Sequence, residues 1–298
     1  MSPHPRNRGS MLVLVLFLAG LLSVFAAVAA MAMRAAQNSS RGFAEGQRAD
    51  EAARGAIEQM VAQSSGTLAN MTGTSTAVFG QAQVVITARN EAARIDLNMA
   101  APALLSGIFR QVGVSPEQAD LYAARIVDWR DEDDKVEKGG AEREAYRALG
   151  RVDGPRNGPF IHVAELGLVL GIPPQIAAAV APYVTVASGQ EQINPLLADP
   201  PVLLALPGVS VNSVRNLLAQ RANPTASAQT LISSLGKGAE PFVTSDTGMA
   251  VRFEARVRLA ANNERRYEAV VYVSGGDTEP FRILAWDANP PERVRALP

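Results

Sequence analysis

The sequence predicts an α+β protein in which a long N-terminal helix packs on an antiparallel sheet, with a large all-α domain inserted into that sheet. Three observations lead to this fold class. An uncharged apolar run near the N-terminus continues into an amphipathic helical pattern, strand-like alternation flanks a central block, and that block has helical periodicity. With 298 residues, 47% of them apolar, the chain is long enough for one large domain or two ordinary ones.

The N-terminal apolar run is long enough to cross a membrane. From Ser10 to Met33 no residue is charged. The 23 residues from Met11 onward would form a helix of about 34 Å, and a bilayer hydrocarbon core is about 30 Å thick. Arg6 and Arg8 precede the run without any acid. Because basic residues stay on the cytoplasmic side, the N-terminus should lie inside and the body outside.

Three interpretations of this segment compete. It could be a secretory signal peptide, with Ala27-Val28-Ala29 as the small-residue cleavage site, or an uncleaved signal anchor. The third rests on the boundary Arg8-Gly9-Ser10-Met11, which resembles the cleavage site of type IV prepilins and pseudopilins. In those proteins a basic leader ends in Gly and a dedicated peptidase cuts on the cytoplasmic face. This interpretation predicts cleavage between Gly9 and Ser10.

The fifth residue after that cleavage site is Leu14. Pilin-like proteins usually carry Glu there, and in them its partner is thought to be the terminal amine of a neighbouring subunit. A carboxylate in an apolar filament core is costly unless it is paired. A subunit at the very tip has no neighbour ahead of it, so Leu14 in place of the usual Glu favours a position at the tip.

Downstream of the apolar run, the helical pattern becomes amphipathic and ends near Gln63. The segment 64–76 is rich in Ser, Thr, Gly and Asn, which predicts a loop. Residues 82–88 predict a short strand, and residues 95–98 are expected to close this first strand region.

A block of short helices follows, and strands return after it. The helical pieces are 101–112, 116–129, 142–149, 162–170, 174–181, 200–206, 210–221 and 228–235. Strict alternation over 249–260, then 266–274 and 281–286, predicts the remaining strands. The predicted divisions are therefore a leader at 1–9, a transmembrane helix at 10–33, a helix with the first strands at 34–97, an inserted α-domain at 98–235 and C-terminal strands at 236–298.

The helical block contains a degenerate repeat. Val112-Gly113-Val114-Ser115 and Pro207-Gly208-Val209-Ser210 each join two apolar helices through a tight glycine turn, and Leu170-Gly171-Ile172-Pro173 is a third copy. In each copy a Ser or Pro opens the next helix. These patterns predict helix–hairpin–helix units.

Taken in order, several segments make the chain resemble the general secretion pathway protein K family, the K-type minor pseudopilins of the type II secretion system. The resemblance rests on the Gly9 leader, the missing Glu at position 14, and the segments 124–131, 140–142 with Tyr146, 159–161 with 165–166, 181–186 and 193–194.

The resemblance implies a pseudopilin fold with a large inserted α-domain. It also implies a subunit that caps the pseudopilus tip with the I- and J-type minor pseudopilins, initiates assembly and supports protein export. The major pseudopilin, the prepilin peptidase and the inner-membrane assembly platform are further implied partners. The expected location is the bacterial inner membrane, with a single span and the body in the periplasm.

The densest polar cluster, residues 128–144, holds eight carboxylates against four basic side chains. Calcium takes six to eight oxygen ligands, and it would relieve the repulsion between closely spaced carboxylates. Asp131, Asp133 and Glu142 stand at relative positions 1, 3 and 12 of an EF-hand loop. Lys135 and Val136, at positions 5 and 6, exclude an EF-hand.

Two interpretations of the cluster remain open, a calcium site and a solvated acidic loop. Members of the resembled family are known to bind calcium, which favours the first. The predicted ligands are Asp131, Asp133, Asp134 and Glu142, and no organic cofactor is expected.

Composition argues against an enzyme. The chain has no cysteine and only two histidines, so thiol nucleophiles and a histidine metal cluster are excluded. His162, near Pro159-Phe160, is expected to be buried or to cap a helix, because no Ser and Asp show a triad-like signature. The sequence contains no G-x-S-x-G, P-loop or G-x-G-x-x-G motif.

The rival hypothesis is a membrane-anchored DNA receptor, because helix–hairpin–helix turns bind phosphates through backbone amides and nearby basic residues. Two observations weaken this hypothesis. DNA-binding hairpins usually read Gly-apolar-Gly, whereas Ser115, Ser210 and Pro173 stand at the second Gly position. Segment 96–235 has 15 acidic residues against 11 lysines and arginines, a net charge of −4, which is the wrong sign for a phosphate partner. No nucleic-acid partner is therefore expected.

Overall fold

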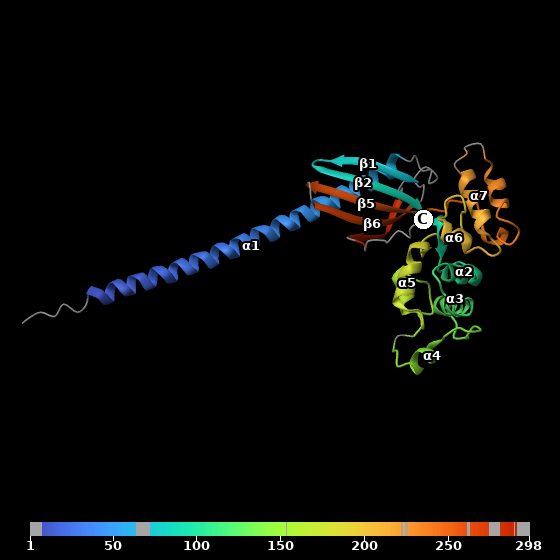
Figure 1. Ribbon diagram of the computed structural model, residues 1–298, viewed down its shortest axis with the longest axis horizontal. Helices are drawn as coiled ribbons and strands as arrows, with labels where there is room; N and C mark the ends of the chain where they lie inside the picture. The colour runs from blue at the N-terminus through green and yellow to red at the C-terminus, as the bar shows by residue number, and fades with distance from the viewer. Residues whose placement is uncertain are drawn as a thin grey trace, which may run out of the picture.

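The computed structural model describes residues 8–63, 72–152, 154–221, 223, 226–260, 263–273, 281–288 and 290. The predicted fold class is confirmed. A rod-like helix, α1, runs from one end of the molecule onto an antiparallel sheet, and a cluster of short helices lies beyond the other end of the sheet (Figure 1).

Helix α1 spans Arg8–Gln63 and has two chemically different halves. Between Met11 and Met33 nearly all apolar side chains are exposed. Among the described residues, α1 is the one helix long and apolar enough to cross a membrane. In the second half, Ala49, Ala53 and Ile57 recur at helical spacing and are buried against the sheet.

The main sheet has five strands in the order β1-β2-β5-β6-β7, with every neighbouring pair antiparallel. The strands are β1 Gly73–Phe79, β2 Ala82–Asn90, β5 Ala250–Ala260, β6 Asn263–Val273 and β7 Phe281–Ala288. On the face toward α1, Val84 pairs with Val257 and Ile86 with Ala255, and all four side chains are buried. Because every second side chain of a strand points to the same face, the apolar side chains of β2 and β5 form a core with the alanine-rich face of α1.

Strand β1 corrects the predicted loop at 64–76. Residues 64–71 lie outside the described part of the chain, but residues 73–76 belong to β1 and pair with β2. Gly80 has a φ of +60° in the turn that joins the two strands. Ser and Thr made this segment resemble a loop, although β-branched Thr also suits an exposed edge strand.

The helical block comes between β2 and β5 in the chain. Its elements are η2 Glu91–Ala93, β3 Ile95–Asp96, α2 Pro102–Gln111, α3 Pro116–Arg130, α4 Arg143–Ala148, η3 Val163–Leu168, α5 Pro174–Val180, η4 Ala181–Tyr183, β4 Val184–Thr185, α6 Pro200–Leu204, α7 Val211–Arg221, α8 Ala228–Ser233 and η5 Glu240–Phe242. The block has its own hydrophobic core, in which Leu104, Ile108 and Ile126 are fully buried.

Two predictions within the block need correction. Residues 95–98 do not close the main sheet, because β3 pairs in parallel with β4 of the helical block. Residues 162–170 do not form an α-helix but the 3₁₀-helix η3, and Gly167 lowers the α-helical propensity there. His162 caps η3, as expected, because its Nδ1 accepts a hydrogen bond from the amide of Ala164 at 3.0 Å.

The repeat turns have the glycine conformation that a helical hairpin needs. Gly113, between α2 and α3, has a φ of +87°, and Gly208, between α6 and α7, has a φ of +73°. The hydroxyl of Ser115 accepts from the amide of Gln118 and caps α3.

Candidate functional site

The acidic loop folds back on the last turn of α3. Asp128 is fully buried there, and its carboxylate accepts hydrogen bonds from the amide of Glu137 at 3.2 and 3.4 Å. Gly140 approaches the same carboxylate so closely that a Cβ would have no room. The loop is therefore tied at two points to a buried acid that the predicted ligand set did not include.

Glu142 lies beside this buried acid and is only 4% exposed. Within the described part of the chain, neither of its carboxylate oxygens has a hydrogen-bond partner, and the same holds for Oδ1 of Asp131. Buried acceptors without partners are costly. The carboxylate oxygens of Glu142 and Oδ1 of Asp131 are therefore available to a ligand from outside the described part of the chain.

The electrostatics of Glu142 agree with its geometry. Burial, followed by the negative charges of Asp128, Asp131, Asp134 and Asp133, raises the pKa of Glu142 from 4.5 to about 7. Burial also raises the pKa values of Asp128 and Asp131. A cation would lower the free energy of all these ionised carboxylates.

The outer two predicted ligands have local partners instead. Oδ1 of Asp133 accepts from the amide of Lys135 at 2.8 Å, and Oδ1 of Asp134 accepts from the side-chain amide of Asn157 at 3.1 Å. Across the residues that the structure places, no group of three or more acidic or histidine side chains is close enough to hold a metal ion. The loop therefore places the four predicted calcium ligands in one region, but their carboxylates do not meet at one point.

The other two functional predictions concern α1. Gly9 and Ser10 lie in its first turn. Leu14 follows within the exposed apolar stretch, and its side chain is 56% exposed. The apolar half of α1 therefore presents a leucine to its surroundings at the position where the usual carboxylate would stand.

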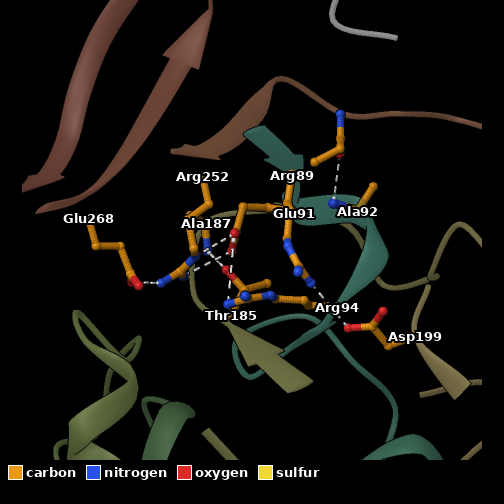
Figure 2. Close-up of polar contacts among 10 residues, drawn as sticks. Arg89, Glu91, Ala92, Arg94, Thr185, Ala187, Asp199, Arg252 and Glu268 are labelled. Carbon is orange, nitrogen blue, oxygen red and sulfur yellow. Dashed lines mark hydrogen bonds and ion pairs between the residues drawn. The ribbon is translucent and has the colours of Figure 1, made fainter. Parts of the chain in front are cut away.

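A second polar cluster joins the sheet to the helical block (Figure 2). Nε of Arg252, on β5, donates to Oε1 of Glu91 at 2.8 Å, and Arg252 also pairs with Glu268 of β6. Glu91 is fully buried in η2, where the chain leaves β2 for the helical block. Figure 2 shows Arg252 between the two acids, with Thr185 of β4 next to Glu91.

Glu91 is ionised in this cluster. Burial alone would raise its pKa, but the charges of Arg94 and Arg252 and hydrogen bonds from Arg252 and Thr185 outweigh that effect. Together they lower the pKa of Glu91 to about 2. Sequence reasoning missed this cluster, because Glu91 and Arg252 are separated by 161 positions and neither belongs to a motif.

A long N-terminal helix that is apolar at its exposed end and packs its other end on an antiparallel sheet is the fold of a pseudopilin. Comparison with known structures supports this class. The chain is similar, with a TM-score of 0.67, to a chain of the crystal structure of the GspK–GspI–GspJ complex from the enterotoxigenic Escherichia coli type 2 secretion system. The two are 20% identical, and the match covers 84% of this chain and 99% of that chain.

A family model matches part of the sequence. Residues 87–189, which run from the end of β2 through much of the helical block, match the family model described as type II secretion system protein K. No curated protein sequence matches the chain. The family match and the structural match both agree with the resemblance of the sequence to the K-type minor pseudopilins.

Proposed function

We propose that this protein caps the tip of the periplasmic pseudopilus together with I- and J-type minor pseudopilins, initiates its assembly and so supports protein export across the outer membrane. The match to protein K over residues 87–189 supports a structural, non-enzymatic role. The complex that contains the similar chain joins GspK to GspI and GspJ, which is the reason to expect the corresponding partners here.

The observation that carries the proposal is the position of the helical block. It lies beyond the end of the sheet that is opposite to the free half of α1 (Figure 1). A subunit within a filament needs neighbours both ahead of it and behind it along the axis. A helical block of domain size at the leading end leaves no simple place for a neighbour ahead, as expected for a terminal subunit.

Leu14 gives independent support. An exposed leucine in the apolar half of α1 cannot form an ion pair with the terminal amine of another subunit. A subunit with nothing ahead of it loses nothing by this change. A Leu14→Glu variant should therefore secrete no better than the unchanged protein.

The membrane part of the proposal follows from α1. The apolar stretch anchors the precursor in the inner membrane with Arg8 on the cytoplasmic side and the body in the periplasm. The prepilin peptidase removes residues 1–9, and the assembly platform passes the mature subunit toward the pseudopilus, where the major pseudopilin continues the shaft.

Calcium binding at the acidic loop is also part of the proposal. The unpartnered oxygens of Glu142 and Asp131 have the chemistry that a hard divalent cation prefers, and Asp133 and Asp134 would complete the carboxylate set. Binding requires these carboxylates to move closer together, because they do not meet at one point in the present structure. When bound, the ion would supply positive charge that offsets the repulsion between these carboxylates and holds the loop against α3.

Complex formation tests the proposed partners. The full-length chain in detergent should purify with the I- and J-type subunits of its own organism as a complex of about one copy of each, measured by native mass spectrometry. The chain alone should stay monomeric. Polymers of the chain alone, or an I–J complex that forms without retaining it, would contradict the proposal.

A further inference from the structure

A cavity of about 410 Å³ lies between the end of β2 and the chain that leads into α6. It is separate from the acidic loop and has no part in the function proposed above. Apolar side chains line part of it, among them Pro182, Leu196 and Leu197. The polar part of the lining contains Arg89, Asn90, Arg94, Asp199 and Arg221.

The charges at this cavity do not cancel. Arg89 forms an ion pair with Asp199 at 3.5 Å, and these side chains are 43% and 56% exposed. Arg221 donates to the backbone carbonyls of Pro195 and Ala198, which are neutral acceptors. One carboxylate, Asp199, therefore faces two arginines.

The third arginine belongs to the neighbouring buried cluster. Arg94 lies 3.9 Å from Glu91, which also pairs with Arg252, and Arg252 pairs in turn with Glu268. Two arginines and two carboxylates balance in that cluster. The cavity is therefore left with a net charge of +1 from Arg89, Arg221 and Asp199, which is suited to one monovalent anion.

Asn90 provides an independent sign of a missing ligand. It lines the cavity, is only 2% exposed, and its Oδ1 accepts from the amide of Ala92 at 2.9 Å. Its Nδ2 has no hydrogen-bond partner among the described residues. A buried amide donor without an acceptor is unfavourable, so an incoming oxygen would be stabilised here.

We propose that this cavity binds a carboxylate group carried by a peptide chain of a protein partner. Guanidinium groups bind carboxylates through paired charge-assisted hydrogen bonds, and one net positive charge matches a carboxylate better than a doubly charged phosphate. The apolar lining receives the aliphatic part of the peptide, and the volume is within the usual range for ligand pockets, about 300–1,000 Å³.

Short peptides test the proposal directly. The full-length chain in detergent micelles is titrated with N-acetyl-trialanine, with its C-terminal amide, and with N-acetyl-Ala-Asp-Ala-amide, and binding is measured by ligand-observed NMR. At least one peptide with a carboxylate should bind about tenfold more tightly than the uncharged amide. If only N-acetyl-trialanine binds, the source of the carboxylate is a chain terminus. If only N-acetyl-Ala-Asp-Ala-amide binds, the source is an acidic side chain.

Two variants with opposite expected effects separate recognition from damage to the fold. Arg89→Gln should weaken binding of the carboxylate peptide about fivefold, because it removes an exposed donor and a positive charge. Asp199→Asn should strengthen it about threefold, because it removes the competing carboxylate and raises the net charge. Arg215→Gln, on the exposed face of α7 and outside the cavity, makes the same charge change as Arg89→Gln and should have no effect.

The proposal is overturned if none of the peptides binds, or if the carboxylate peptides and the amide bind equally. It is also overturned if Asp199→Asn weakens binding. None of these results depends on whether the protein caps a pseudopilus, so this test can fail while the proposed function stands.

Discussion

Arg252 and Glu91 form a buried ion pair with a separation of 2.8 Å between Nε and Oε1, although 161 positions separate them in the sequence. Glu91 stands where the chain leaves the sheet, and Arg252 stands near the start of β5, where the chain has returned (Figure 2). The pair thus connects β5 with η2, the first element of the helical block, and it helps to fix the orientation of the block relative to the sheet.

Removing one member of this pair should destabilise the protein strongly. Glu91→Gln leaves the Arg252 guanidinium buried with less compensating charge, and breaking such a pair costs about 3–5 kcal/mol. Urea unfolding of the full-length chain in detergent measures the loss. As a control, Glu264→Gln removes an exposed partner of Arg258 on the same sheet and should cost less than about 1 kcal/mol.

The same pair should make stability depend on pH in the acidic range. The folded-state pKa of Glu91, about 2, lies below its ordinary value of 4.5, so its contribution is complete above pH 4.5 and is lost as the pH falls toward 2. Between these values the contribution should decrease by about 1.4 kcal/mol per pH unit. The difference in unfolding free energy between the wild type and Glu91→Gln, measured at pH 6, 4.5 and 3.5, should therefore become smaller as the pH falls. A constant difference would show that Glu91 is not the titrating group.

The sequence was sufficient to predict the elements whose side chains alternate with a clear period. The apolar and amphipathic halves of α1 and the strands near 249–286 were predicted because their burial follows the local pattern. Strand β1 was missed because most of its side chains are exposed, so that pairing with β2 through the backbone defines it. No hydrophobic pattern marks such an edge strand.

The candidate site was predicted only in its outer part. The charge density of residues 131–142 revealed the loop. Asp128, in contrast, belongs to α3, and its role depends on the loop folding back so that Gly140 contacts its carboxylate. The pairing of Glu91 with Arg252 likewise requires the whole sheet to form first. Long-range contacts of this kind have no local sequence signal.

Calcium should stabilise the folded chain through the acidic loop. A ligand that binds only the folded state at 100 times its dissociation constant adds about 2.7 kcal/mol. Thermal melts of the full-length chain with millimolar calcium and with a chelator measure this difference. Glu142→Gln should abolish it, whereas Glu144→Gln, which changes an exposed acid in the first turn of α4, should leave it intact. Superimposable melts of the wild type would argue against the site.

Processing should occur between Gly9 and Ser10. N-terminal sequencing of the mature protein should begin at Ser10, and Gly9→Val should leave uncleaved precursor in the inner membrane, because a β-branched side chain would crowd the scissile bond. Gly20→Val makes the same substitution inside the apolar stretch, where nothing lies within 4 Å of an added Cβ, and should be processed normally. A mature protein that begins near Ala30 would instead establish an ordinary signal peptide.

The position of the protein on assembled pseudopili tests the tip assignment most directly. Immunogold labelling with antibodies against the helical block should place gold particles at one end of each pseudopilus, because the block occupies the leading end of the subunit (Figure 1). The major pseudopilin, labelled in parallel, should appear along the whole shaft. Gold particles spaced regularly along the shaft for this protein as well would contradict the account.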